Sequence, residues 1–293
     1  MVAVIAGPTA SGKSAMALAL AEARNGTIIN ADASQLYADL RVISARPTAG
    51  EEARVPHRLY GVLDGDDVAN AARWATMARQ AIDDALAAGR LPILVGGTGL
   101  YLTTLIDGIA PVPDIEAEVR TTVRAMATVE AAAALAREDP ALAARLRPSD
   151  RQRLLRGLEV VRSTRRSLLD WQREPAGGIA AAFDVRAMVV DIDREDLRAR
   201  VEPRLWAMLD AGALGEVAAL VDRRLAADRP VLRALGVDQF AALLAGRLDR
   251  DAAVAAAATA TRQYQKRQLT WARSQVPTWR RVDSPENALD WLS

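Results

Sequence analysis

A glycine-rich loop at the start of the chain constrains the fold more than any other feature. Residues 2–6 are all apolar and predict a buried strand. Residues 7–14, Gly-Pro-Thr-Ala-Ser-Gly-Lys-Ser, match the phosphate-loop pattern G-x-x-x-x-G-K-[ST] at every fixed position. An Ala- and Leu-rich segment from about residue 14 to residue 24 predicts a helix. Strand, glycine loop and helix in this order predict an α/β core on a parallel sheet.

This loop indicates a site for a diphosphate or a triphosphate. Its glycines let consecutive backbone N–H groups turn towards phosphate oxygens, and the helix N-terminus adds a partial positive charge. Lys13 can reach the outer phosphate, and the hydroxyl of Ser14 can ligate Mg²⁺. The pattern specifies neither a nucleotide nor hydrolysis, and the alternative is an ordinary glycine-rich turn. We predict phosphate contacts from Gly7, Thr9, Ala10, Ser11, Gly12, Lys13 and Ser14.

Composition excludes several other classes of protein. The chain has 293 residues, of which 51% are hydrophobic, so it can form one large domain or two smaller ones and is not a disordered chain. It contains no cysteine, which excludes disulfides and thiolate metal sites. The phosphate loop begins at residue 7, and no apolar run approaches the ~20 residues of a membrane helix. We therefore expect a cytoplasmic protein with no signal peptide and no membrane partner.

Two further predicted strands end at residues that can carry chemistry. Residues 27–30 and 91–95 predict strands, followed by Asp32 and by the glycine loop 96–101 respectively. Ligands bind beyond the carboxyl ends of the strands in open α/β sheets, so Asp32 is expected near the phosphate loop. We interpret Asp32 as a catalytic base, the alternative being a metal-binding or helix-capping carboxylate. His57, the only histidine, is interpreted as a structural residue.

The middle of the chain differs from the rest because it shows helical patterns and no strand. Prolines at 111–113 and glycines at 177–178 mark its two ends. We therefore predict an all-helical insertion domain over residues 113–183, within a core formed by residues 1–112 and 184–293.

Individual helices and strands in the second half follow from periodicity and caps. Within the insertion, one helix is predicted over 130–138 and another begins near Ser149, which serves as its cap. Beyond it, the sequence predicts a strand over 185–192, a long helix over 195–211 and a last helix over 251–275.

Two regions of the chain are strongly basic. Residues 145–173 contain nine arginines against three acidic residues. Residues 262–281 contain six basic residues and no acidic one, and Tyr264 and Trp271 lie among them. Basic residues interleaved with aromatic ones suit a nucleic-acid backbone. Two such regions around one phosphate-loop core favour nucleic-acid binding over a simple solvated surface.

Several stretches together resemble the bacterial tRNA dimethylallyltransferases over nearly the whole chain. The loop at 7–14 includes the family's Pro and Thr, residues 30–37 look like its Asn-Ala-Asp-Ser-x-Gln-Val-Tyr, and residues 55–57 resemble its Val-Pro-His-His. Residues 96–101 match its Gly-Gly-Thr-Gly-Leu-Tyr. Further ordered matches are the arginine-rich helix at 150–160, the Arg-x-x-x-Met pattern at 204–208 and the closing helix at 261–271.

The resemblance implies a P-loop NTPase-like fold and a prenyl transfer to tRNA. A dimethylallyl group would pass from dimethylallyl diphosphate to N6 of adenosine 37, with release of diphosphate. Asp32 would remove the N6 proton, Thr98 would contact the diphosphate or the N6 group, Arg204 would bind the diphosphate, and Mg²⁺ would be the cofactor. The implied partner is the tRNA anticodon arm, not DNA, bound by a monomer. The implied RNA contacts are Asp32, Ser34, Gln35, Arg151, Gln152, Arg153, Arg156, Arg262, Gln263, Lys266 and Arg267.

The chain departs from the family's pattern at a few positions. The family usually has Ser, Lys, His, Gly and Arg or Lys where this chain has Ala33, Arg46, Arg58, Arg165 and Asp238. None of these positions is in the phosphate loop or is one of the residues implied in catalysis. The departures therefore concern detailed contacts to RNA and leave the reaction class unchanged.

Three alternative functions remain open from the residues. An isopentenyltransferase acting on free AMP, ADP or ATP would share the loop and the chemistry, but it has little use for two basic regions. A small-molecule or nucleotide kinase would use Asp191 or Asp193 as its Walker-B carboxylate. A phosphate-loop RNA-binding switch would bind RNA in a nucleotide-dependent manner without covalent change.

Overall fold

The computed structural model describes residues 1–291, which form two compact units. The larger unit comprises Met1–Ile106 and the chain from Ala180 onward, and the smaller unit is Asp107–Ile179. Each unit has its own hydrophobic cluster. Within residues 1–291, no helix is long and apolar enough to cross a membrane.

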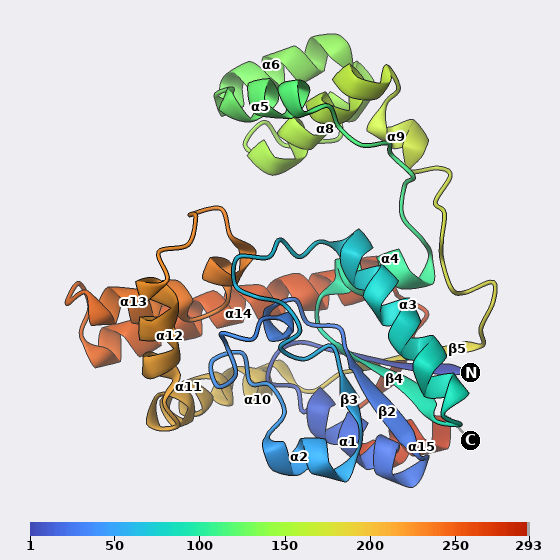
Figure 1. Cartoon of the computed structure of the whole chain (residues 1–293), viewed down its shortest axis with the longest axis vertical. Helices are drawn as coiled ribbons and strands as arrows, with labels where there is room; N and C mark the ends of the chain where they lie inside the picture. Colours follow the sequence, from blue (N-terminus) through green and yellow to red (C-terminus); the bar gives the residue numbers. More distant parts are fainter. Residues whose placement is uncertain (292–293) are drawn as a thin grey trace. The chain divides into compact units, whose positions relative to one another are not determined.

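A six-stranded sheet forms the centre of the larger unit (Figure 1). Its strand order is β3-β2-β4-β1-β5-β6, and every neighbouring pair is parallel. This confirms the predicted α/β fold with a parallel sheet. The strands are β1 (Val2–Ala6), β2 (Gly26–Asn30), β3 (His57–Arg58), β4 (Leu91–Gly96), β5 (Val185–Val190) and β6 (Arg280–Val282).

Helices cover both faces of the sheet, which is why β1 and β2 are buried along their whole length. One face carries α1 (Lys13–Ala23) and α15 (Pro285–Trp291), and the other carries α3 (Ala71–Ala87) and α4 (Gly99–Ile106). Trp74 of α3 is fully buried, and its indole N–H donates to the Asn30 carbonyl at the end of β2 (2.8 Å). This contact anchors the point where Asp32 leaves the sheet.

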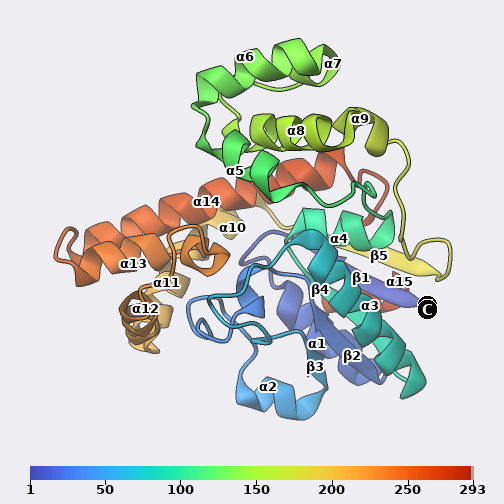
Figure 2. The same ribbon diagram turned by 45° about the horizontal axis from the view of Figure 1, so that its top comes forward.

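Further helices of the larger unit surround the carboxyl ends of the strands. Figure 2 shows the long α14 running beside α11 and α13, and α14 packs against both of these helices. The elements in this group are η1 (Ser34–Leu36), α10 (Arg194–Ala199), α11 (Val201–Asp210), α12 (Ala213–Asp222), η2 (Pro230–Arg233), α13 (Val237–Leu244) and α14 (Arg250–Ser274). The short helix α2 (Ala49–Arg54) instead leads into the amino end of β3, and its Arg54 pairs with Glu22 of α1.

The smaller unit is helical. Val123, Leu135 and Leu158 are fully buried in its core, and the buried carboxylate of Glu159 pairs with Arg124 (3.1 Å) and Arg156 (3.6 Å). Its helices are α5 (Ala117–Ala125), α6 (Thr128–Glu138), α7 (Pro140–Ala143), α8 (Arg151–Thr164) and α9 (Leu168–Trp171).

Two local predictions were wrong and a strand was missed, each for a physical reason. The helix predicted over 195–211 is broken between α10 and α11, because the ring of Pro203 would clash with the Ala199 carbonyl in a continuous helix. The cap of α8 is Asp150, whose carboxylate accepts from the Arg153 N–H (3.3 Å), and not Ser149. Arg280 and Arg281, the last residues of the basic region 262–281, lie in the edge strand β6, which was not predicted because three residues are too few to show a period of two.

Candidate active site

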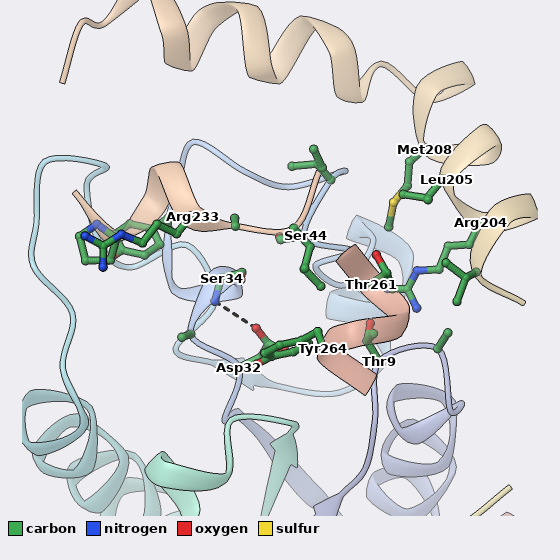
Figure 3. A pocket seen from close by; sticks show the side chains of 18 of the residues that line it. Thr9, Asp32, Ser34, Ser44, Arg204, Leu205, Met208, Arg233, Thr261 and Tyr264 are labelled. Carbon is green, nitrogen blue, oxygen red and sulfur yellow. Dashed lines mark hydrogen bonds between the residues drawn. The ribbon is translucent and has the colours of Figure 1, made fainter. Parts of the chain in front are cut away.

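A cavity of about 320 Å³ lies in the larger unit, beyond the carboxyl ends of β1 and β2. One part of its wall is polar and includes Thr9, Asp32, Ser34 and Arg204 (Figure 3). The other part is apolar and is formed by Ile43, Val201, Leu205, Met208 and Leu235. The combination suits a ligand with an anionic end and a short hydrocarbon end.

Asp32 is held in place by the side chain of Asn30, which is fully buried. The Asp32 N–H donates to Asn30 Oδ1 (2.8 Å), and Asn30 Nδ2 donates to the Asp32 carbonyl (2.9 Å). The Asp32 carboxylate accepts from the Ser34 N–H (3.0 Å) and lines the cavity (Figure 3). This bond forms an Asx turn, and the N-cap of η1 is Ala33, which makes no side-chain cap bond.

The phosphate loop forms the predicted cradle at the start of α1. Ala10 and Gly12 have positive φ angles of 66° and 90°, which turn successive peptides of the loop inward. Thr9 and Ala10 line the cavity. The backbone N–H of Ser11 is not free, because it donates to the Pro8 carbonyl (3.2 Å). The Ser11 hydroxyl is buried and has no hydrogen-bond partner.

Two cations and one carboxylate interact electrostatically at this loop. Burial lowers the pKa of Lys13 to about 8, while Asp32 opposes this shift and Arg204 adds to it. Burial likewise lowers the pKa of Arg204, and Asp32 opposes that shift too. Lys13 Nζ donates to the Pro8 carbonyl (3.4 Å). An anion bound here would relieve the repulsion between the two buried cations.

Thr98 connects the glycine loop after β4 to the Asp32 segment. Its Oγ1 accepts from the Ala33 N–H (3.0 Å), and its own N–H donates to the Ala31 carbonyl (3.2 Å). It also hydrogen-bonds the Tyr264 hydroxyl, whose pKa burial raises to about 12. Thr98 is therefore next to the site, but it is not one of the residues lining the cavity.

The predicted RNA contacts of the larger unit lie in different environments. Ser34 and Arg267 line the cavity, and Lys266 and Gln263 are exposed on α14. Gln35 is committed to the protein, since its Nε2 donates to the carbonyls of residues 44 and 45 (3.0 and 2.7 Å). Arg262 of α14 is half-buried. The structure thus brings only part of this set to the cavity.

The predicted RNA contacts on α8 belong to the smaller unit. Arg151, Gln152 and Arg153 are exposed at the first turn of the helix. Arg151 donates to the carbonyls of Met126 (2.5 Å) and Arg124 (2.8 Å), so it also holds α8 to α5. Several other arginines of this basic region form ion pairs within the unit, which reduces its excess positive charge.

Asp193 and His57 make structural contacts, and Asp191 is exposed. Asp193 caps α10 by accepting from the Glu195 N–H (2.7 Å), and Asp191 is exposed beyond β5. Neither lines the cavity, and the carboxylate of Asp193 is already engaged at the start of α10. His57 Nδ1 pairs with the Val55 carbonyl (2.9 Å) on the edge strand β3, as expected of a structural histidine.

The donor set for a metal ion is small. Residues 1–291 contain no group of three or more His, Cys, Asp or Glu side chains that could hold one. Ser14 is exposed in the first turn of α1 beside the phosphate loop. A site with the Ser14 hydroxyl as one of few protein ligands suits Mg²⁺, because this ion keeps several waters and takes further ligands from substrate phosphates.

Some residues of the site were missed by sequence reasoning. The apolar wall could not be assigned from sequence, and Ser44, Arg233 and Tyr264 were not proposed as cavity residues. The spacing of Thr261, Gln265 and Gln268 on α14 carried a signal, because polar residues at helical intervals were buried together. The sequence prediction for α14 described only its basic residues and did not include these buried polar ones.

Two family models match the chain. One described as IPP transferase matches residues 35–275, which include Thr98, Arg204 and all of α14. One described as isopentenyl transferase matches residues 1–68, which include the phosphate loop and Asp32.

The chain is similar to bacterial proteins over most of their length. It is 58% identical over 281 residues to the tRNA dimethylallyltransferase of Sphingopyxis alaskensis, covering 95% of this chain and 92% of that protein. It is 50% identical over 273 residues to the tRNA dimethylallyltransferase of Zymomonas mobilis, covering 93% of this chain and 88% of that protein.

Solved structures share the fold. A tRNA Δ(2)-isopentenylpyrophosphate transferase from Staphylococcus epidermidis matches with a TM-score of 0.69 at 27% identity, covering 99% of this chain and 97% of that one. A eukaryotic dimethylallyltransferase acting on tRNA matches with a TM-score of 0.82 at 28% identity, covering 94% of this chain and 71% of that one.

Proposed function

The chain belongs to the IPP transferase family, and we propose that it transfers a dimethylallyl group from dimethylallyl diphosphate to N6 of adenosine 37 in tRNA. The observation that carries this proposal is the cavity itself. Thr9 and Ala10 of the phosphate loop, Asp32 and Arg204 line it together with an apolar wall. A prenyl diphosphate has an anionic end that suits the polar part of the cavity and a hydrocarbon end that suits its apolar part.

Asp32 acts as the general base in this reaction. Adenine N6 is a weak nucleophile because its lone pair is delocalised into the ring. Asp32 takes the N6 proton while the new N6–C1 bond forms and the C1–O bond to the diphosphate breaks. The side chain of Asn30 hydrogen-bonds both the N–H and the carbonyl of Asp32, and this fixed backbone orients the carboxylate for the transfer. General-base assistance contributes typically ~10²–10⁴-fold.

The phosphate loop, Lys13 and Arg204 stabilise the negative charge that develops on the leaving diphosphate. Their contribution is large because two partly buried cations and fixed backbone dipoles act in a site with little water. Bound Mg²⁺ held by the Ser14 hydroxyl would supply further charge neutralisation to the phosphate oxygens.

The apolar wall holds the five-carbon group. Leu205 and Met208 of α11 face Ile43 and Leu235 from two other segments of the larger unit. These side chains exclude water from C1, which protects the allylic carbon from hydrolysis. Thr98 acts indirectly, because its hydroxyl fixes the Ala33 N–H beside the base.

The anticodon arm is the proposed nucleic-acid partner, bound by a monomer. Arg267 lines the cavity, and Lys266 is exposed beside it on α14, so the phosphate backbone next to the target base would meet positive charge. Removing the base from its stack costs a few kcal/mol, which backbone contacts offset. The exposed first turn of α8 is a second proposed RNA contact.

Mass spectrometry tests this function directly. An anticodon stem-loop with adenosine at position 37 is incubated with the protein, Mg²⁺ and dimethylallyl diphosphate, and free AMP is offered in a parallel reaction. We expect the stem-loop to gain the mass of one five-carbon unit and AMP to remain unmodified. Modification of AMP but not of the stem-loop would instead identify the enzyme of free nucleotides.

A further inference from the structure

Two buried glutamines of α14 hydrogen-bond the phosphate loop at a single residue. Gln265 and Gln268 are only 3% and 6% exposed. Gln265 Nε2 donates to the Thr9 carbonyl (3.0 Å), and Gln268 Oε1 accepts from the Thr9 N–H (2.9 Å). The two peptides that flank Thr9 are therefore both bonded to the same helix.

The bond from Gln265 fixes the direction of the Ala10 N–H group, one of the predicted phosphate donors of the loop. The Thr9 carbonyl and the Ala10 N–H belong to one trans peptide, so they point in opposite directions. Because Gln265 bonds the carbonyl from α14, the Ala10 N–H is directed away from α14. Ala10 lines the cavity and has φ 66°, a conformation that is strained for an alanine and must be held by its surroundings.

The bond from Gln268 acts on the preceding peptide. The Thr9 N–H and the Pro8 carbonyl share that peptide and also point in opposite directions. The Pro8 carbonyl accepts from Lys13 Nζ (3.4 Å) and from the Ser11 N–H (3.2 Å). The orientation set by Gln268 therefore extends to the cation of the loop.

Gln268 also connects the two glycine loops of the site. Its Nε2 donates to the Gly97 carbonyl (3.0 Å), so its whole amide group is bonded. A side chain at Gly97 would meet this nitrogen at 2.0 Å and the Gly7 carbonyl at 2.8 Å. The close approach of these loops leaves no space for a side chain at position 97, so Gln268 lies directly against the Gly97 backbone.

We propose that Gln265 and Gln268 are positioning residues for the leaving diphosphate, acting through the peptides on either side of Thr9. This assignment rests on the proposed function of the same site. The two amides hold Ala10 in its left-handed conformation and keep the loop donors oriented before the anion arrives. The exposed side of α14 carries the proposed RNA contacts Lys266 and Arg267, so one helix serves both substrates with different faces.

The variant Gln265→Met tests the assignment, because methionine matches the side-chain volume and removes the donor. The probe is inorganic pyrophosphate, whose binding is measured by calorimetry and does not require transfer to occur. We expect its Kd to rise about tenfold, the KM for dimethylallyl diphosphate to rise in parallel, and the Kd for tRNA to stay within about twofold.

Two further variants separate positioning from general destabilisation. Val254→Ala removes buried volume from α14 at a residue that does not touch the loop, so we expect a lower Tm with an unchanged pyrophosphate Kd. Adding Ala10→Gly to Gln265→Met should recover part of the lost affinity, because glycine adopts a positive φ without strain. If Gln265→Met does not fold, Gln268→Met replaces it in the same comparison.

An unchanged pyrophosphate Kd in the glutamine variant would overturn the assignment, as would an equal rise in Val254→Ala. Failure of the proposed function is distinguishable from both results. It would show as a wild-type protein that binds pyrophosphate but modifies no tRNA.

Discussion

Raising the pH from 7 to 9 is expected to weaken the binding of dimethylallyl diphosphate by about tenfold. Burial lowers the pKa of Lys13 from 10.5 to about 8, with Asp32 opposing and Arg204 adding to the shift. In the free protein the ammonium form therefore predominates below pH 8 and the neutral amine above it. The anion binds the ammonium form, so affinity is lost as the pH rises.

The magnitude follows from the pKa of about 8. The apparent Kd scales with 1 + 10^(pH − pKa), a factor of about 1.1 at pH 7 and about 11 at pH 9. Bound diphosphate raises the pKa of Lys13 in the complex, so the weakening continues above pH 9 until that higher value is reached. The terminal phosphate of the ligand loses its last proton near pH 6, so the ligand contributes little over this range.

Calorimetric titration of dimethylallyl diphosphate at about pH 7, 8 and 9, at one low ionic strength, measures this effect. The KM for the same substrate at saturating tRNA gives a second readout. Lys13→Arg is the matched control, because a guanidinium stays charged throughout and its profile should be flat. The reasoning is refuted if the wild-type Kd changes less than about twofold between pH 7 and 9. An equal loss of affinity for dimethylallyl diphosphate in Lys13→Arg between pH 7 and 9 would also refute it.

Three further predictions concern the base, a helix end and the RNA surface. Asp32→Asn should keep tRNA and diphosphate binding and lower kcat by ~10²–10⁴-fold in single-turnover assays, because it keeps the shape and removes the base. Arg165→Gly should raise the free energy of unfolding by about 1 kcal/mol in a denaturant titration, because Arg165 ends α8 with φ 57° where glycine is unstrained. The affinity for tRNA should fall ~10³-fold between about 50 and 200 mM salt if about six phosphates are neutralised.

Each of these has a contrary outcome. Near-normal turnover in Asp32→Asn would remove Asp32 from the chemistry. A destabilised Arg165→Gly variant would mean that the arginine side chain stabilises the helix end by more than its backbone strain. A tRNA affinity that hardly changes with salt would contradict the assignment of the basic residues as RNA contacts.

Short-range sequence patterns were enough for the core of the fold. The strand over 2–6 and the loop over 7–14 are contiguous, so their structure depends on neighbouring residues and could be predicted. The last helix was predicted over 251–275 and spans Arg250–Ser274. The strands β3 and β6 have two and three residues, too few to show a period of two, and were missed.

The candidate site was predictable only in part. Asp32 was placed near the phosphate loop because carboxyl ends of parallel strands meet at one edge of a sheet. The apolar wall joins Ile43, Met208 and Leu235, which lie on segments far apart in the chain, and no local pattern relates them. The functional roles of Thr98, Gln35 and the α8 arginines stay predictions. The limits of the all-helical insertion domain, 113–183, also stay a prediction.

The sequence by itself determined that a phosphate-binding loop, a carboxylate near it and two basic regions would be present. The loop and the basic regions depend on spacing within single segments, and the position of the carboxylate follows from the rule that the carboxyl ends of parallel strands meet at one edge of a sheet. Tertiary structure decided which side of α14 contacts the phosphate loop and which side is exposed. Gln265 and Gln268 hydrogen-bond Thr9, which lies more than 250 positions earlier in the chain. A helix shows its periodicity in the sequence, but which loop it packs against depends on how the whole chain folds.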